Sequence, residues 1–478
     1  MFKKLTSSIL LLSMLALLAA CGGDAGKVET GETTVPETTA EPTILDTLPK
    51  ADYDGAKFTI LIPLEHTYDF SEEQNGETVN DLEFERDRTV EELYNVTIQY
   101  VAESGQWAAK DTFNGLIIQS VMANDGAFDL VDGMIAVTLP LAMEGYFVDL
   151  NSLDSIDLSK PWWVGSMVEG LSVSDKLFGI CGSSLLSMYK SSYIMYANSK
   201  LIEEYQLEDP IQLVLDGKWT ADKFMKMAAD KTRDLNSDDM LDKADFFGYI
   251  LKNVPQRGFQ TSMDLNVIKN DNGKLTFTGL TDKFVEGADK LVNFLSSTEQ
   301  RYMLSENYDL IPMFINDQAI FFNETILTAE KLRDMKSDFV MIPQPKYDEA
   351  QEDYYVQMGT GSGMLFIPKT AKNVDMTANV MNALACISRE NVVPAYYEYA
   401  LKEKYTRSEE NKAVIDIIND SITMEATFAF ASIIGGSIND LFLNATAKAY
   451  PAASMFESNK STIEAGIEKL EAAFAAIK

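Results

Sequence analysis

Apolar runs that alternate with amphipathic stretches constrain the fold of this chain more than any other feature. Residues 58–63 are almost continuously apolar, which is typical of a strand buried on both faces. A helical spacing of apolar residues follows over 80–95, then a strand pattern over 96–101 and a second helical pattern over 113–121. The apolar run 128–132 completes the series. The order strand–helix–strand–helix–strand predicts a doubly wound α/β fold.

The N-terminus has the order of a bacterial secretory signal. Lys3 and Lys4 precede an apolar run over 9–18, which is too short to cross a bilayer core about 30 Å thick. Small residues at 19 and 20 then precede Cys21, an arrangement that resembles the lipobox of bacterial lipoproteins. The resemblance implies removal of residues 1–20, acylation of Cys21 (palmitate) and attachment to the outer face of the cell membrane. The alternative is an ordinary secretory signal in which a cysteine follows small residues by chance.

The composition beyond the signal describes a tether and a large folded body. Residues 21–50 are Gly, Thr, Glu and Pro with few large apolar side chains, which predicts a flexible linker. The 478-residue chain is 46% apolar and 10% aromatic, enough for the cores of two or three domains. Its formal net charge of −33 argues against nucleic acid and anionic lipid as partners. We therefore expect an extracellular body held to the membrane only by the lipid on Cys21.

Cysteine and histidine are too sparse for a disulfide scaffold or a zinc site. Apart from Cys21, the chain has Cys181 and Cys386, and His66 is its one histidine. Two buried thiols that act as small apolar side chains are the favoured interpretation, and a disulfide between them is the alternative. The chain has too few cysteine and histidine residues to favour a zinc centre or a histidine-based catalytic triad.

Four segments carry a resemblance to a known family. They are NDLEFERDRTVEELYNVTI (80–98), FDLVDG (128–133), KLIEEYQLEDPIQLVLDGKWTADKF (200–224) and GMLFIPKTAKN (363–373). In order and spacing they resemble bacterial extracellular solute-binding proteins (family 1) of ABC importers, in the carbohydrate-leaning branch that includes maltose-binding protein. The resemblance implies a type II periplasmic-binding-protein-like fold, α/β throughout, in which two discontinuous lobes joined by crossing strands close on a ligand.

Mapped on this resemblance, lobe one comprises residues 51–185 and 340–395, and lobe two comprises 186–339 and 396–478. Residues 176–180 are expected to form an outgoing crossing strand. The last helix is expected to begin with a capping box at Ser461 and Glu464 and to pack an apolar stripe into the core. That stripe consists of Ile463, Ile467, Leu470, Phe474 and Ile477.

An acidic loop at 234–245 has the spacing of an EF-hand calcium loop. Oxygen ligands at loop positions 1, 3, 5, 7, 9 and 12 would come from Asp234, Asn236, Asp238, Met240 (by its carbonyl), Asp242 and Asp245. Asp239 stands where the loop needs glycine for its sharp turn, and Asp245 is shorter than the usual bidentate glutamate. Structural calcium is the prediction, and a solvated loop of Asx turns is the alternative.

Aromatic side chains are the first candidates for ligand contact, because the C–H faces of pyranose rings stack on them. The candidates are Trp107, which follows the second strand, and the pair Trp162 and Trp163 in a loop after a proline. Trp219 is excluded from this set, since its place before the predicted cap Thr220 is typical of a hydrophobic staple.

Polar and aromatic residues at the carboxyl ends of strands are the second set, because doubly wound sheets bind ligands there. This rule selects His66, Tyr68, Asp132, Ser183, Ser184, Tyr249, Phe259, Asn323 and Glu324. For His66 the alternative is a buried residue with its hydrogen bonds satisfied. The motif GTGSG at 359–363 precedes a strand and lacks the P-loop lysine, so it is interpreted as a tight turn or hinge near the cleft.

The sequence thus predicts a monomeric, lipid-anchored receptor that captures an oligosaccharide by lobe closure and delivers it to the transmembrane subunits of an ABC permease. No catalysis and no organic cofactor are expected. The alternatives are an extracellular glycoside hydrolase that uses paired carboxylates, and a receptor of the same fold for peptides. A surface adhesion protein is disfavoured, since the chain has no internal repeats.

Overall fold

The computed structural model describes residues 44–252, 254–278, 281–297, 302–304, 310–401, 409–435 and 437–477. The predicted signal, Cys21 and most of the predicted linker lie outside these residues. Within the described ranges, no helix combines the length and the apolar character that a membrane span requires. Ile44–Lys478 forms one compact unit, which contains two larger β-sheets and two short strand pairs.

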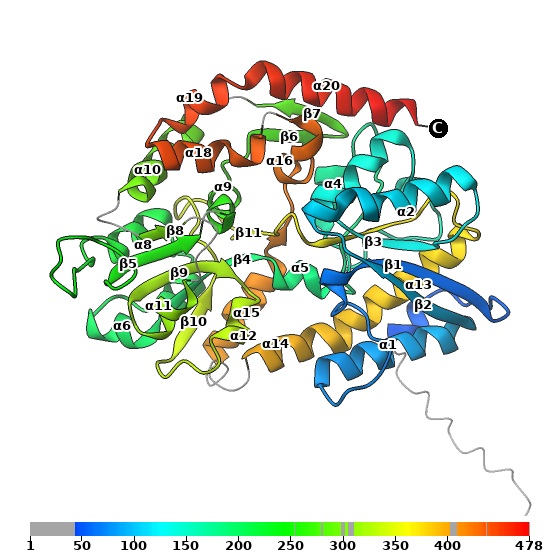
Figure 1. Ribbon diagram of the computed structural model, residues 1–478, viewed down its shortest axis with the longest axis horizontal. Helices are drawn as coiled ribbons and strands as arrows, with labels where there is room; N and C mark the ends of the chain where they lie inside the picture. Colours follow the sequence, from blue (N-terminus) through cyan, green and yellow to red (C-terminus); the bar gives the residue numbers. More distant parts are fainter. Residues whose placement is uncertain are drawn as a thin grey trace, which may run out of the picture. The chain divides into compact units, whose positions relative to one another are not determined.

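The first sheet has the strand order β12-β3-β1-β2 (Figure 1). Its strands are β1 (Ala56–Pro63), β2 (Val96–Glu103), β3 (Leu130–Met134) and β12 (Gly363–Phe366). β1 pairs in parallel with β2 and β3, and helices α1 (Thr78–Tyr94) and α2 (Lys110–Ala123) make the connections. β12 returns antiparallel to β3 and leads into α13 (Val374–Ile387), which packs on α1. The order β1, α1, β2, α2, β3 confirms the predicted strand–helix alternation. Six of the eight residues of β1 are buried, as expected for a strand that is covered on both faces.

The second sheet has the order β10-β4-β9-β5-β8. Its strands are β4 (Tyr193–Asn198), β5 (Phe247–Lys252), β8 (Tyr302–Leu304), β9 (Ala319–Thr325) and β10 (Phe339–Ile342). β5 is parallel to β8 and β9, whereas β4 is antiparallel to β9 and β10. An aromatic core centres on Phe224 of α8 (Ala221–Ala228), with the rings of Trp219 and Phe321 at 6.1 and 5.7 Å.

Trp219 has the packing role predicted for it. Thr220 is the N-cap of α8, and its hydroxyl accepts a hydrogen bond from the Lys223 amide. Trp219 precedes this cap and contacts Phe224 four residues into the helix, which is the arrangement of a hydrophobic staple. Its indole N–H also donates to the Pro343 carbonyl oxygen at 2.9 Å.

The prediction of a crossing strand at 176–180 is wrong. The chain turns at Ser174 and Asp175, whose φ angles are 52° and 61°. After the turn, the segment forms only isolated bridges, among them Ile180 with Leu365. The Leu177 amide donates to the Asp149 carboxylate instead of to a neighbouring strand, which interrupts any ladder.

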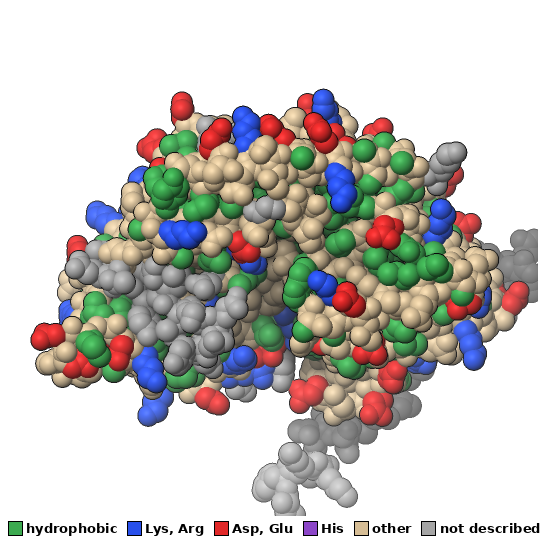
Figure 2. Space-filling view, turned by 45° about the horizontal axis from the view of Figure 1, so that its top comes forward, with side chains coloured by type: hydrophobic (Ala, Val, Ile, Leu, Met, Phe, Trp, Pro, Cys, Tyr) green, Lys and Arg blue, Asp and Glu red, His purple; other side chains and the backbone are tan. Residues whose placement is uncertain are grey.

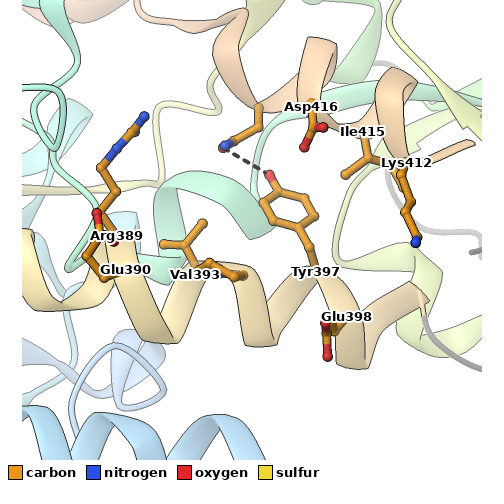
Figure 3. Close-up of a pocket in the computed structure, with 10 residues that line it drawn as sticks. Arg389, Glu390, Val393, Tyr397, Glu398, Lys412, Ile415 and Asp416 are labelled. Atoms are coloured by element: carbon orange, nitrogen blue, oxygen red, sulfur yellow. Dashed lines mark hydrogen bonds between the residues drawn. The ribbon is translucent and has the colours of Figure 1, made fainter. Parts of the chain in front are cut away.

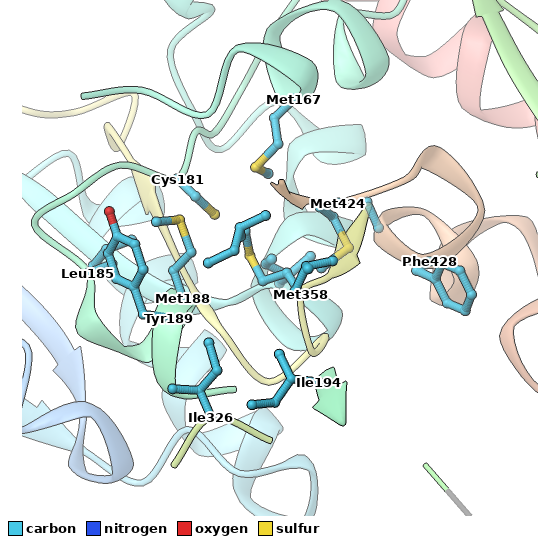
Figure 4. Close-up of a cluster of buried hydrophobic side chains, with 14 of the residues drawn as sticks. Met167, Cys181, Leu185, Met188, Tyr189, Ile194, Ile326, Met358, Met424 and Phe428 are labelled. Atoms are coloured by element: carbon cyan, nitrogen blue, oxygen red, sulfur yellow. The ribbon is translucent and has the colours of Figure 1, made fainter. Parts of the chain in front are cut away.

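A cluster of buried hydrophobic side chains, several of them sulfur-containing, includes Met358 and Met424 (Figure 4), which directly follow β11 (Val356–Gln357) and β13 (Ile422–Thr423). Met167, Met358 and Met424 belong to it, together with Cys181. Cys181 and Cys386 are both buried free thiols, which confirms the favoured interpretation and contradicts the disulfide. Methionine suits such a cluster because its flexible side chain fills irregular gaps.

The C-terminal helices close the unit, and the last of them is α20 (Lys460–Ala476), which packs on α17 (Ala431–Ile434) and β7 (Lys274–Phe277). Its stripe is buried at Ile463, Ile467, Leu470 and Phe474, which confirms core packing. The predicted capping box is wrong, because the helix begins at Lys460 with Asn459 as its N-cap and Ser461 already lies inside the first turn.

The described part of the chain has further α-helices and a strand, β6, that pairs with β7. They are α3 (Ile135–Thr138), α4 (Gly165–Leu171), α5 (Leu186–Lys190), α6 (Ser199–Glu204), α7 (Pro210–Leu215), α9 (Gly258–Ser262), β6 (Ile268–Asp271), α10 (Asp282–Ser296), α11 (Ile311–Ile315), α12 (Thr328–Lys331), α14 (Val393–Leu401), α15 (Glu409–Asp420), α16 (Ala426–Ala429), α18 (Leu441–Lys448) and α19 (Ala452–Glu457). Acidic and basic side chains are interspersed over the face shown in Figure 2.

Candidate functional site

A cavity of about 800 Å³ lies at the ends of strands from both larger sheets. Its wall takes residues from the segments that follow β2, β3 and β5, from the turn before β12 and from the helices after β13. The residues that line it are Trp107, Met134, Ala136, Val137, Val254, Arg257, Thr360, Gly361, Phe428, Ala431, Ser432, Gly435, Ser437, Asn439 and Asp440. Because parallel strands expose their carboxyl ends at one edge, the loops that follow them meet at this cavity.

The wall offers one exposed aromatic face and several polar groups. Trp107 is 59% exposed, and the Lys110 ammonium lies 4.1 Å from the centre of its ring. Across the cavity lining, the Arg257 guanidinium donates to the Asp440 carboxylate. The Ser432 hydroxyl donates to the Ala136 carbonyl oxygen at 3.2 Å. An indole face beside charged and hydroxyl groups can stack on a sugar ring while hydrogen bonding to its hydroxyls.

His66 and Asp132, two of the predicted site residues, lie beneath this wall. His66 follows β1, is only 2% exposed, and its Nδ1 lies 3.2 Å from Asp132 Oδ2. Its Nε2 lies 2.9 Å from the carbonyl oxygen of Gly361, which lines the cavity. Burial alone lowers the pKa of His66, but the Asp132 carboxylate reverses this and raises the pKa to about 9. His66 therefore contacts the cavity wall through Gly361, and Asp132 is linked to the wall through His66, a buried side chain with both ring nitrogens in hydrogen bonds.

Asp69 joins the same network, although the sequence rules did not select it. It is fully buried, and its Oδ1 accepts a hydrogen bond from the Ser187 amide at 2.6 Å. Burial and the neighbouring Asp132 carboxylate raise the pKa of Asp69 to about 7. The Ser187 hydroxyl in turn accepts a hydrogen bond from the Gly363 amide at 3.1 Å. The loop after β1, the start of α5 and the turn 359–363 are thus joined by side-chain hydrogen bonds.

The predicted pair Trp162 and Trp163 packs inside the body. Trp162 is 5% exposed and donates its indole N–H to Asn382 Oδ1 of α13 at 3.3 Å. Trp163 is 4% exposed and lies so close to Gly182 that a Cβ there would come within 2.5 Å of its ring. Ser183 and Ser184 are buried beside them, and the Ser183 amide donates to the Trp162 carbonyl oxygen. None of these four residues lines the cavity.

The predicted residues Tyr249, Phe259, Asn323 and Glu324 do not line the cavity either. Tyr249 and Phe259 belong to the aromatic core, with ring centres 4.9 and 5.9 Å from that of Phe224. Asn323 Oδ1 accepts a hydrogen bond from Gln344 at 2.8 Å, and Glu324 forms an ion pair at 2.7 Å with the Lys252 ammonium.

Tyr68, in the loop after β1, is half-buried. The Lys190 ammonium lies 4.4 Å from the centre of its ring, and Tyr68 does not line the cavity. Trp107 is the one predicted ligand residue that lines the cavity itself.

The conformation of the acidic loop at 234–245 is stabilised by hydrogen bonds from its backbone amides to its own carboxylates. Asp234 accepts hydrogen bonds from the amides of Ser237 and Asp239, at 2.6 and 2.9 Å. Asp245 is fully buried and accepts from the Leu235 and Asp242 amides. These bonds are those of the Asx-turn alternative, and calcium binding by this loop stays a prediction, to be tested by calorimetric titration.

A second cavity, of about 400 Å³, lies between α14 and α15 (Figure 3). Tyr397 lines it and donates its hydroxyl to Asn419 Oδ1 at 3.5 Å. This cavity is half the size of the first and is lined by helix side chains alone. The first cavity, which meets the ends of strands, is therefore the candidate site.

Comparison with solved structures reveals extensive similarity in fold. A cyclo/maltodextrin-binding protein complexed with maltotetraose matches with a TM-score of 0.58 and 10% identity, over 87% of this chain and 98% of that chain. The extracellular solute-binding protein from Staphylococcus aureus in complex with maltose matches with a TM-score of 0.57 and 11% identity, over 88% of this chain and 100% of that chain. The galacto-N-biose-/lacto-N-biose I-binding protein of an ABC transporter from Bifidobacterium longum, in complex with lacto-N-biose, has a TM-score of 0.53 and 14% identity, over 88% and 98%.

No protein-family model matches the sequence, and no curated protein matches it at a significant level. The structural matches establish the fold. The mixed α/β arrangement with open sheets is that of two-lobed, periplasmic-binding-protein-like solute-binding proteins, which confirms the predicted fold class.

Proposed function

We propose that this chain is the extracellular solute-binding component of an ABC importer and that it binds an oligosaccharide in the cavity beside Trp107. The observation that carries the proposal is the place of this cavity, at strand ends of both sheets, with an exposed indole face and polar groups in one wall. The similar solved structures support it, since they are complexes with maltotetraose, maltose and lacto-N-biose.

The proposed mechanism is capture without chemistry. The cavity wall takes residues from segments next to strands of both sheets. A ligand that contacts the residues beside the first sheet and those beside the second sheet at once favours the closed arrangement of the two lobes. The lobes would comprise residues 51–185 with 340–395 and residues 186–339 with 396–478. Closure would present the loaded protein to the transmembrane subunits of the permease.

The enzymatic alternative requires two carboxyl groups about 5–9.5 Å apart at the reacting bond. Among the described residues that line the cavity, Asp440 is the one carboxylate, and it is paired with Arg257. This observation favours binding over glycoside hydrolysis. Incubation with a labelled oligosaccharide separates the two, because a receptor returns the sugar intact and a hydrolase releases products.

The decisive experiment is native mass spectrometry of the protein as purified, followed by calorimetry with a panel of malto- and galacto-oligosaccharides and peptides. One bound saccharide per chain, with a dissociation constant in the micromolar range or below, supports the proposal. Binding of peptides with no response to any glycan contradicts the oligosaccharide and favours the peptide-receptor alternative.

Lipid attachment at Cys21 is proposed from the sequence and has its own test. Labelled palmitate is expected in the wild-type protein, and the Cys21→Ser variant is expected to lose the label and to leave the membrane fraction. A membrane-bound Cys21→Ser variant would contradict this anchor.

A further inference from the structure

Three buried side chains beneath the cavity wall bring metal-binding atoms together. His66, Asp69 and Asp132 each offer one ligand atom, and these atoms lie within 4.8 Å of one another. The three side chains are 2%, 0% and 0% exposed. Among the described residues, this is the one group of three or more His, Cys, Asp or Glu side chains with such a geometry.

Two carboxylate oxygens of this group have no hydrogen-bond partner. Asp69 Oδ2 and Asp132 Oδ1 are buried without one, whereas the other oxygen of each carboxylate accepts a bond. A buried carboxylate oxygen without a hydrogen-bond partner destabilises the folded protein, and a cation bound beside it removes this destabilisation.

The hydrogen bond of the imidazole determines which nitrogen is free to coordinate. Nε2 lies 2.9 Å from the Gly361 carbonyl oxygen, which only accepts, so Nε2 carries a proton. In the neutral ring the lone pair is then on Nδ1, which faces Asp132. Histidine ligands of metals commonly donate their second ring N–H to a carbonyl oxygen in this way.

The distances fit a small transition-metal ion. Nδ1 and Asp132 Oδ2 are 3.2 Å apart. Two ligand atoms that each lie about 2.1 Å from one Zn²⁺ are separated by about 3.2–3.4 Å at a near-tetrahedral angle. A small adjustment of Asp69 completes three protein ligands, with a fourth position for water. A nitrogen ligand and so few oxygens disfavour Ca²⁺ and Mg²⁺.

We propose that His66, Asp69 and Asp132 bind one divalent transition-metal ion, of the Zn²⁺ class, beneath the turn 359–363. The ion takes the place of the proton on His66 Nδ1, and two carboxylates then balance its two positive charges. It cross-links the loop after β1 to β3 and holds Gly361, through the imidazole, in the cavity wall. The role is structural, and it does not depend on the identity of the ligand in the cavity.

The test uses the full-length protein after treatment with EDTA and dialysis. Addition of ZnCl₂ is expected to give one bound Zn²⁺ per chain by elemental mass spectrometry. It is also expected to raise the melting temperature by at least about 3 °C. CoCl₂ is expected to bind at the same site and to develop visible d–d absorption, a readout that needs no variant. The absence of bound Zn²⁺ and Co²⁺ in the wild-type protein would overturn the proposal.

Two isosteric variants locate the ion. Asp69→Asn and Asp132→Asn are each expected to weaken Zn²⁺ binding at least about tenfold. The matched control is Asp129→Asn, since Asp129 is also a buried carboxylate near β3 but bonds the Thr59 amide and stands outside the group. Full Zn²⁺ affinity in both ligand variants would place the ion elsewhere and refute the assignment. Loss of affinity in those two variants but not in the control supports it.

Discussion

The Nε2 atom of His66 lies 2.9 Å from the carbonyl oxygen of Gly361, a residue 295 positions further along the chain. This hydrogen bond joins the loop after the first strand to the turn 359–363, which forms part of the cavity wall. The His66 ring is buried and the Gly361 carbonyl group lies at the cavity. The position of this part of the wall therefore depends on how the buried residues around His66 pack.

Gly363→Ala is expected to destabilise the protein by about 1–3 kcal/mol, because the added methyl group overpacks a buried site. A Cβ at this position would lie 2.2 Å from Asp132 Oδ1 and 2.9 Å from Ser187 Oγ. The matched control is Gly361→Ala in the same turn, where a Cβ would have no atom within 4 Å. Urea denaturation measures both variants, and equal midpoints would contradict the packing described here.

Trp107→Ala is expected to reduce affinity for the bound saccharide about five- to thirtyfold, since one aromatic stacking contact contributes roughly 1–2 kcal/mol. Its melting temperature should stay within about 1 °C of wild type, because the side chain is already 59% exposed. Calorimetric titration gives the affinity. Tyr450→Ala, which removes an aromatic side chain that is 48% exposed and outside the cavity lining, is the control and should bind normally.

Arg257→Met is expected to weaken saccharide binding, because it removes the guanidinium that lines the cavity and leaves Asp440 there as a single negative charge. The side chains of Arg257 and Asp440 are both partly exposed, so the free energy of unfolding should change by less than about 1 kcal/mol. Calorimetry and urea denaturation are measured together. A large loss of stability with unchanged affinity would show that the pair serves the fold instead.

Glu425 should make stability depend on pH. Burial, with a smaller contribution from Asp264, raises the pKa of this half-buried carboxyl group to about 7. An unfolded glutamate has a pKa of about 4.3, so the folded protein binds more protons between these values. The free energy of unfolding therefore falls as the pH rises from about 4.5 to about 7, and the favourable contribution is absent above that range.

The partial exposure of Glu425 limits the expected size of this effect to about 1–2 kcal/mol. Glu425→Gln is expected to remove it, so that the variant gains stability relative to wild type between pH 5 and pH 8. Urea denaturation at both pH values measures the difference. Glu457→Gln, at an exposed position, is the control and should follow the wild-type profile.

The two internal cysteines are expected to react with a thiol reagent only after unfolding. Burial raises the pKa of the Cys181 thiol, and it raises that of Cys386 to about 11. Both groups therefore remain protonated and shielded in the native protein. A thiol count without reductant should give two reactive groups in denaturant from Cys181 and Cys386 together. A count of zero would show a disulfide that the structure does not contain.

Local pattern was sufficient to predict the first sheet. Residues 58–63 form an apolar run and residues 96–101 show a strand pattern, and the structure forms β1 and β2 there. The error at 176–180 has a tertiary cause. The crossing strand was expected from the family resemblance, whereas Leu177 and Phe178 are buried here without a neighbouring ladder.

The cavity was much harder to predict, because its wall is assembled from distant segments. Trp107 could be proposed from its place after a strand, but Arg257 and Asp440 are 183 residues apart and have no local signal that relates them. Burial of Trp162 and Trp163 also has no local signal. They were proposed as ligand contacts from their loop position, whereas both are buried, and glycine at 182 lets the chain cover them closely.

Because His66 is the one histidine in all 478 residues, isotope labelling of histidine alone gives the protein a single imidazole reporter. Its two ring nitrogens would yield one isolated set of nuclear magnetic resonance signals, with no overlap to resolve. One nitrogen faces the carboxylates and the other faces the cavity wall through Gly361. A titration with metal and a titration with saccharide would therefore perturb different nuclei of the same ring, and one spectrum would distinguish the two events.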